Sequence, residues 1–441
     1  MKINFVFDRF HNGKPLNNII NISGDYEKVD GVIHPHYPFD LKMYGFDFFY
    51  KHNNDITSPY TINYIQTKDL PSKSDEINFY PIILNLRDFK DFPWPLLYID
   101  YEMVHQVNSD NVKILIIAPF SKADMEYPVE YIKRANQLAS YSNIIKLNNI
   151  IFMASDDWVV EPIKNYNQEL NGNSSRYVNI NFYERVSNMQ TRIGNENINF
   201  LDLYYSKPKK NNSFLFLNNF PKKHRFLLYK FLEHKNVLND GLVTFRNPVS
   251  ISDYVGNPES FNDFVYPQML QMLKLIGQAD IGFYDFLIKN PTVDKLELEN
   301  DYGFIPNDPN NTGCYVNTDW IEDSYFSVIG EHQVTHNTHI SEKIYKMFYY
   351  SHPFIVYSSP GTLKYLHKIG YKTFPELFDE SYDNMWESAD KLLFIGKQIL
   401  QYCGEEGRKR FEAKMPYIKE TLEYNRNLFI TKDFYEFWAK L

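Results

Sequence analysis

The chain has 441 residues, more than one ordinary hydrophobic core accommodates, so we expect two domains of roughly 200 residues each. Its hydrophobic content of 44% and charged content of 23% are typical of a folded, soluble protein, and its net charge of −9 argues against a broad nucleic-acid-binding surface. The two cysteines, Cys314 and Cys403, fit no metal or redox spacing, which argues against a disulfide framework and favours a reducing compartment.

The N-terminal half of the sequence predicts a parallel α/β sheet. Residues 112–119 (VKILIIAP) and 149–154 (NIIFMA) are apolar runs typical of strands buried on both faces, and residues 128–140 between them have a helical pattern. Such a strand–helix–strand unit builds a parallel sheet through a right-handed crossover. Shorter runs with strand character precede it at residues 3–7, 61–66, 79–86 and 96–99.

A polar segment at residues 206–212 (SKPKKNN) predicts an inter-domain linker. The α/β alternation restarts after it, with predicted elements at residues 213–217, 221–234, 242–245 and 266–275. We therefore expect an α/β fold of two facing Rossmann-like domains with a helical C-terminus. The predicted bounds are 1–205 for the acceptor-side domain, 206–383 for the nucleotide-binding domain and 384–441 for the C-terminal helices.

Residues 326–374 predict a strand, a loop, a capped helix, a buried strand, a glycine turn and a second helix. Ser341 is a good N-cap, and Glu342 in the first turn suits the helix dipole. In open α/β sheets ligands bind at the carboxyl ends of the strands, where this loop lies. Lys343 and the free N–H groups could therefore face a pyrophosphate, while Glu342 accepts from ribose hydroxyls. The alternative is an ordinary capped helix.

A second basic group follows the predicted strand at residues 213–217. Lys222, Lys223 and Arg225 stand in the first turn of the next helix, where cations oppose the helix dipole unless an anion is near. One interpretation is that Arg225 binds a phosphate, in the same kind of position as Lys343. The other is a solvated basic turn.

Three stretches together resemble the donor-binding half of α-1,3-fucosyltransferases, to which exostosin-like glycosyltransferases are similar: FSVIGE at residues 326–331, ISEKI at 340–344 and HPFIVY at 352–357. The layout, with KKHRFLLYKFLE and GTLKYLHKIGYKTF, also resembles glycosyltransferase-like proteins of large bacteriophages and algal viruses. The resemblance covers the C-terminal half well and the N-terminal half loosely.

The resemblance implies a GT-B architecture, in which the C-terminal domain binds a nucleoside diphosphate sugar in the cleft between the domains. By this resemblance Glu342 would bind the ribose, and Lys343 and Arg225 the diphosphate. The expected substrate-binding set is completed by Lys222, Glu331 and Ser341. After Glu331 the chain has His332-Gln333 where the fucosyltransferase pattern has Asn-Ser, so fucose is not assumed.

The sequence contains no Asp-x-Asp pair of the kind that holds a metal against a diphosphate, the nearest being Asp156-Asp157, which reads better as a cap. We therefore expect a metal-independent reaction without a cofactor, in which Lys and Arg neutralise the leaving diphosphate. A rival interpretation is a zinc site. It would use the loop histidines His332, His336 and His339, or the pair His34 and His36.

An inverting transferase needs a base that deprotonates the acceptor hydroxyl. Our candidate is Glu126, which follows the predicted strand at residues 112–119. Alternatives at other strand ends are Asp124, Asp100, Glu102 and His36 with Asp40. A retaining enzyme would require no such base.

The sequence thus favours a cytoplasmic hexosyl- or pentosyltransferase that acts on a glycan, a protein or a modified DNA base. It has neither a signal-peptide pattern nor an apolar run of the ~18 residues that a membrane span needs. Two alternatives stay open: a viral glycosyltransferase acting on a flipped DNA base, and a non-catalytic virion or assembly protein with the same fold.

Overall fold

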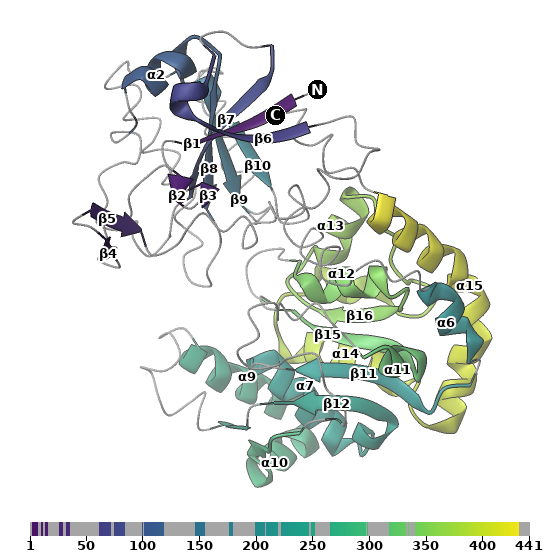
Figure 1. The fold of residues 1–441 in the computed structure, drawn as a ribbon. Coiled ribbons are helices and arrows are strands. Elements are labelled where there is room, and N and C mark those ends of the chain that lie inside the picture. Colours follow the sequence, from purple (N-terminus) through teal and green to yellow (C-terminus); the bar gives the residue numbers. More distant parts are fainter. Residues whose placement is uncertain are drawn as a thin grey trace. The chain divides into compact units, whose positions relative to one another are not determined.

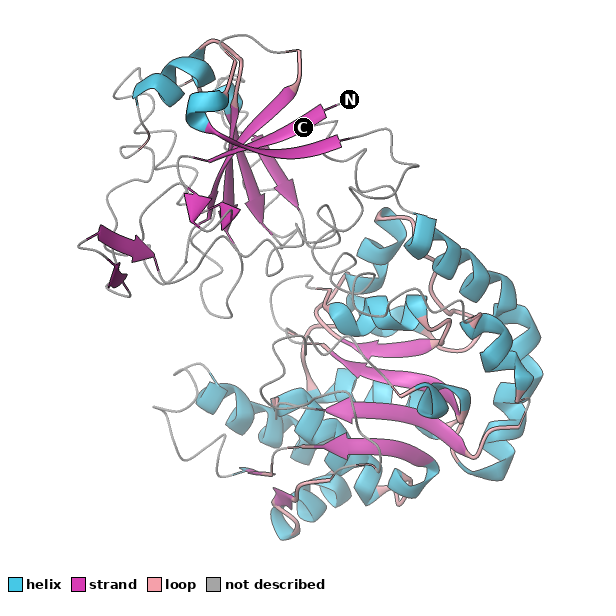
Figure 2. Ribbon diagram, viewed as in Figure 1, coloured by secondary structure: helices cyan, strands magenta, loops and turns pink. Residues whose placement is uncertain are grey.

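The computed structural model describes the following residues: 2–7, 10–11, 14–15, 26–29, 32–35, 61–71, 75–83, 99, 101–118, 146–154, 176–179, 199–207, 209–218, 222–246, 248–251, 265–296, 298, 317–331, 334 and 340–431. The chain divides into two compact units. The N-terminal unit comprises Met1–Thr191 with Asp433–Leu441, and the C-terminal unit comprises Arg192–Lys432. Each unit contains a parallel sheet, so the predicted α/β class with two parallel sheets is confirmed (Figures 1 and 2).

The sheet of the N-terminal unit has the strand order β10-β9-β8-β7-β1-β6, and all its strand pairs are parallel. Its strands are β1 (Lys2–Phe7), β6 (Thr61–Gln66), β7 (Ile77–Ile83), β8 (Lys113–Ala118), β9 (Ile150–Ala154) and β10 (Arg176–Asn179). The apolar runs predicted most of these strands, whereas β10 carries no such run. Helix α2 (Tyr101–Asn108) precedes β8, and the helix predicted at residues 128–140 lies outside the described residues.

Two small hairpins complete the described strands of this unit. One pairs β2 (Phe10–His11) with β3 (Lys14–Pro15), and the other pairs β4 (Tyr26–Val29) with β5 (Val32–Pro35). Both are antiparallel and separate from the main sheet.

The sheet of the C-terminal unit has the order β12-β11-β15-β16, and its strands are also all parallel. They are β11 (Asn212–Asn218), β12 (Gly241–Phe245), β15 (Ser324–Gly330) and β16 (Phe354–Tyr357). All residues of β15 and β16 are buried, as their apolar sequences predict. A short antiparallel pair, β13 (Val249–Ser250) with β14 (Thr292–Val293), lies outside this sheet.

Helices cover both faces of this sheet (Figure 2). The connections from β11 to β12 and from β15 to β16 run in opposite directions, so right-handed crossovers place α7 and α12 on opposite faces. The α7 face carries α7 (Lys223–His234), α9 (Val265–Ala279), α10 (Ile281–Lys289) and α14 (Ala389–Leu400). The α12 face carries α12 (Glu342–Tyr349) and α15 (Gly404–Thr431). The shorter helices are α6 (Phe200–Ser206), α11 (Thr318–Glu322) and α13 (Thr362–Lys368).

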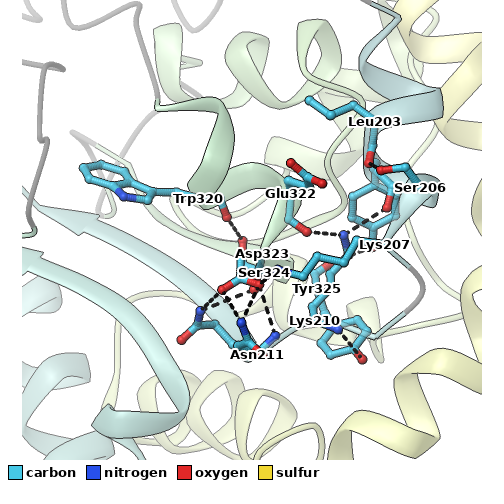
Figure 3. Close-up of polar contacts among 12 residues, drawn as sticks. Leu203, Ser206, Lys207, Lys210, Asn211, Trp320, Glu322, Asp323, Ser324 and Tyr325 are labelled. Carbon is cyan, nitrogen blue, oxygen red and sulfur yellow. Dashed lines mark hydrogen bonds and ion pairs between the residues drawn. The ribbon is translucent and has the colours of Figure 1, made fainter.

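In the segment predicted as a linker, Lys207 and residues 210–212 instead contact the amino-terminal edge of this sheet, and Lys210 is buried (Figure 3). The Lys210 ammonium donates to the carbonyl oxygens of Tyr204 (2.9 Å) and Glu322 (2.5 Å). Asp323 accepts from Asn212 Nδ2 at 2.9 Å and forms an ion pair with Lys207. The lysines and asparagines of this segment made it look solvated, but Lys207, Lys210, Asn211 and Asn212 have partners at Glu322 or Asp323, more than 100 positions away.

The chain divides into its two units at a different position from the one the sequence predicted. Tyr204 in α6 donates its hydroxyl to the Tyr325 carbonyl at 2.7 Å, which ties α6 to β15. The division falls after Thr191, whereas the sequence predicted it after residue 205, so α6 belongs to the C-terminal unit. Helices α14 and α15, predicted as a separate C-terminal segment, belong to this unit as well. Among the described residues, no helix is both long and apolar enough to cross a membrane.

Candidate functional site

The candidate site lies at the carboxyl edge of the C-terminal sheet, the edge at which its parallel strands end. The chain leaves the neighbouring strands β11 and β15 in opposite directions, toward β12 and toward β16. This makes the gap between their carboxyl ends the topological switch point, where open α/β sheets bind their ligands. Of the predicted substrate-binding residues, Lys222 and Arg225 follow β11, and the other four follow β15.

Arg225 joins the two strands at the switch point. From the first turn of α7 its Nε donates to the Gly330 carbonyl at 3.0 Å, and its Nη2 donates to the Glu331 carbonyl at 3.2 Å. A Cβ on Gly330 would lie 2.7 Å from Arg225 Cγ, so only glycine allows this approach. The side chain is 3% exposed. These contacts give Arg225 a role in holding the end of β15.

Glu331 continues this network toward α12. Its carbonyl accepts a hydrogen bond from His224 Nε2 at 2.8 Å, and its Oε1 accepts from the Ser341 backbone N–H at 3.0 Å. Burial, followed by the charge of Arg225, lowers the pKa of His224, so this imidazole is neutral and donates through Nε2. Glu331 therefore connects the start of α7 to the start of α12.

The predicted cap of α12 is confirmed. Ser341 Oγ accepts from the Lys343 backbone N–H at 3.2 Å, and Glu342 stands in the first turn. The Lys343 ammonium lies 3.2 Å from Ser341 Oγ and 3.2 Å from Glu342 Oε1. The side chains of Glu342 and Lys343 are 19% and 24% exposed, which makes this pair the part of the network that a solute can reach.

The basic turn of α7 has an acidic partner that sequence reasoning missed. Lys222 is the N-cap residue and offers no side-chain acceptor to the first-turn N–H groups. Lys223 forms an ion pair with Glu387 at 2.9 Å, with both side chains almost fully buried. No local sequence signal could reveal this pair, because its members are 164 positions apart.

A second missed residue, Asp383, controls the start of α13. Gly361 precedes this helix with a φ of 80°, a left-handed conformation that favours glycine. The Asp383 carboxylate accepts from the backbone N–H groups of Leu363 (3.0 Å) and Lys364 (3.2 Å). The start of α13 is therefore bound by the Asp383 carboxylate.

The structure places the remaining candidates as follows. Glu102 is exposed on α2 of the N-terminal unit, and His34 lies in β5. The other candidate bases and histidines lie outside the described residues: Glu126, Asp124, Asp100, His36, Asp40, His332, His336 and His339. Asp156 and Asp157 lie outside them as well. Within the described ranges, His, Cys, Asp and Glu side chains form no group of three that could hold a metal ion.

This arrangement is suited to binding an anion. It joins the start of α7 to a partly exposed lysine at the start of α12 through a continuous set of hydrogen bonds. Comparison of the chain with protein-family models and with curated proteins finds no match.

Proposed function

We propose that the C-terminal unit binds the diphosphate of a nucleoside diphosphate sugar at the carboxyl edge of its sheet, and that the protein transfers the sugar to an acceptor. The observation that carries the proposal is the connected path Arg225–Glu331–Ser341–Lys343 across the switch point. It brings both predicted phosphate-binding cations to one edge of one sheet, from two elements that are distant in sequence.

The geometry supports different tasks for the two cations. Arg225 is buried and donates to two backbone carbonyls, so its proposed task is to hold the end of β15 in place. Lys343 is partly exposed at a helix start, so its proposed task is to contact the diphosphate. The neighbouring carboxylate of Glu342 remains our candidate for the ribose hydroxyls.

In the proposed reaction an acceptor oxygen forms a bond to the anomeric carbon while the bond from that carbon to the diphosphate breaks. Lys343 and the N-terminal amide groups of α7 and α12 would stabilise the negative charge that develops on the diphosphate. A two-domain GT-B arrangement, with the acceptor base supplied by the N-terminal unit, is part of this proposal. Glu126 stays our candidate base.

The test is a thermal-shift panel of UDP, GDP, CDP and ADP with their sugars. A ligand at a hundred times its dissociation constant adds about 2.7 kcal/mol to stability. We expect one nucleotide series to stabilise the wild type, and Lys343→Ala to weaken that binding by about tenfold or more, ~1.4 kcal/mol. The melting temperature without ligand should not change, because the side chain is partly exposed.

The matched control is Lys397→Ala, which removes an exposed lysine from the last turn of α14. It should bind the nucleotide like the wild type. If no nucleotide stabilises the wild type, the proposal fails and a non-catalytic assembly protein becomes the better reading. Wild-type affinity in Lys343→Ala would remove the proposed site.

A further inference from the structure

The buried carboxylate of Glu387 has a described partner for only one of its two oxygens. Its Oε2 pairs with Lys223, but its buried Oε1 finds no hydrogen-bond partner among the described residues. Within the described part of the chain it is the one charged side chain with a buried, unpartnered oxygen. A half-satisfied buried charge costs several kcal/mol, so a partner for this oxygen is expected.

The segment that carries Glu387 is held firmly at the carboxyl edge. The Lys391 ammonium donates to the carbonyl oxygens of Met385 (2.9 Å) and Ser358 (2.7 Å). Ser358 directly follows β16, and Lys223 is the first residue of α7. Glu387 is thereby fixed near the end of β16 and the start of α7, on the edge that carries the proposed diphosphate site.

Two hydroxyl groups at and just after the end of β16 are also buried and lack a partner among the described residues. They belong to Tyr357, the last residue of β16, and to Ser359 in the following turn. Burial raises the pKa of Tyr357, and the charge of Glu387 raises it further, which places the phenol in the electrostatic field of the carboxylate. Its ring lies 5.3 Å from that of His224, at the start of α7.

Trp386 directly precedes Glu387 in the chain and adds a large exposed surface to this segment. Its side chain is 61% exposed, although tryptophan is usually one of the more buried residues. An indole ring offers a flat apolar face, and the carboxylate and hydroxyls of the same edge offer acceptors and donors. A hydroxylated sugar ring matches both, since it has C–H groups on its faces and hydroxyls around its rim. A phosphate does not match, because the carboxylate would repel it.

We propose that Glu387, Tyr357 and Trp386 bind the sugar portion of the ligand, with the carboxylate and the phenol hydrogen-bonded to sugar hydroxyls and the indole stacked on the ring. This inference rests on the proposed function, because it assumes that the diphosphate occupies the neighbouring Lys343 site. It separates the carboxyl edge into a cationic part for the diphosphate and a part around Glu387 for the sugar.

The experiment compares the affinities of UDP and GDP with those of UDP-glucose and GDP-mannose by calorimetry. In Trp386→Ala, Tyr357→Phe and Glu387→Gln we expect binding of the nucleoside diphosphate to stay within about twofold. Binding of the corresponding nucleotide sugar should weaken by about tenfold. Trp386→Ala removes an exposed side chain and Tyr357→Phe breaks no described hydrogen bond, so both should fold. Tyr417→Ala, at another exposed aromatic, is the control and should not change either affinity.

The outcomes separate this inference from the proposed function. A wild type that binds neither these four probes nor any nucleotide of the thermal-shift panel would overturn both. Binding of nucleoside diphosphates with equal losses for diphosphate and nucleotide sugar in the variants would overturn the sugar assignment alone. Unchanged affinities in all three variants would do the same.

Discussion

Each edge of the C-terminal sheet has a buried lysine that donates to two backbone carbonyls, but the polar groups around the two lysines differ. At the amino edge Lys210 donates to the carbonyl oxygens of Tyr204 and Glu322, and at the carboxyl edge Lys391 donates to those of Ser358 and Met385. Burial lowers the pKa of each lysine to about 8. Each lysine thus fixes two backbone segments that are separated in sequence.

The surroundings differ in how completely the polar groups are paired. At the amino edge the Tyr204 hydroxyl donates to the Tyr325 carbonyl, and the Tyr325 hydroxyl donates to Glu412. Asp323 accepts from several donors there (Figure 3). Buried hydroxyls without a described partner occur there too, at Ser213 and Ser351. The carboxyl edge has, in addition, a buried charged oxygen without a described partner, Glu387 Oε1. The described difference between the edges is therefore this charged oxygen, which gives the carboxyl edge hydrogen-bonding capacity for a ligand.

The largest effect that sharpens this comparison is a dependence of stability on pH. Between pH 8 and 10.5 the native state holds fewer protons than the unfolded state at Lys210 and Lys391, so the free energy of unfolding rises with pH. Each lysine should contribute about 2 kcal/mol by pH 10. Above pH 10 the buried tyrosines with raised pKa values, among them Tyr204 and Tyr357, act in the opposite direction.

Urea denaturation from pH 7 to 10 measures this dependence. Because other groups titrate in the same range, the informative quantity is the difference between the wild type and Lys391→Met or Lys210→Met. The difference in the free energy of unfolding between the wild type and each variant should change with pH by the contribution of the lysine that was removed. This change should be similar for Lys210 and Lys391. A difference that stays constant with pH would show that these lysines keep ordinary pKa values in the native state.

A smaller effect is the difference in stability cost between removing one buried tyrosine hydroxyl at each edge. Tyr204→Phe removes a buried hydrogen bond of 2.7 Å, leaves the Tyr325 carbonyl with less pairing and should cost about 1 kcal/mol. Tyr357→Phe removes a buried hydroxyl that has no described partner, so its cost should be about zero or negative. Denaturant midpoints of the two variants measure both. Equal losses would mean that the Tyr357 hydroxyl has a structural partner, and the contrast between the edges would disappear.

The elements that could be predicted from the sequence are those with a strong local pattern. The apolar runs that became β8, β9, β15 and β16, and the Ser341 cap of α12, are determined by neighbouring residues. The contacts that define the site are not local. Glu387 reaches Lys223 across 164 positions, and Arg225 reaches Gly330 across 105. The segment at residues 206–212 misled for the same reason, since the carbonyls that bury Lys210 include one contributed by Glu322.

The most direct test of the proposed site is amide hydrogen exchange of the full chain with and without the nucleoside diphosphate that stabilises it best. We predict that the nucleotide slows exchange at the starts of α7 and α12, around residues 223–226 and 341–344, where the amide groups of the first helical turns would meet the diphosphate. The amino edge around Lys210 and Asp323 should show no change. Protection confined to the amino edge or to the N-terminal unit would contradict the assignment of the diphosphate site to the carboxyl edge.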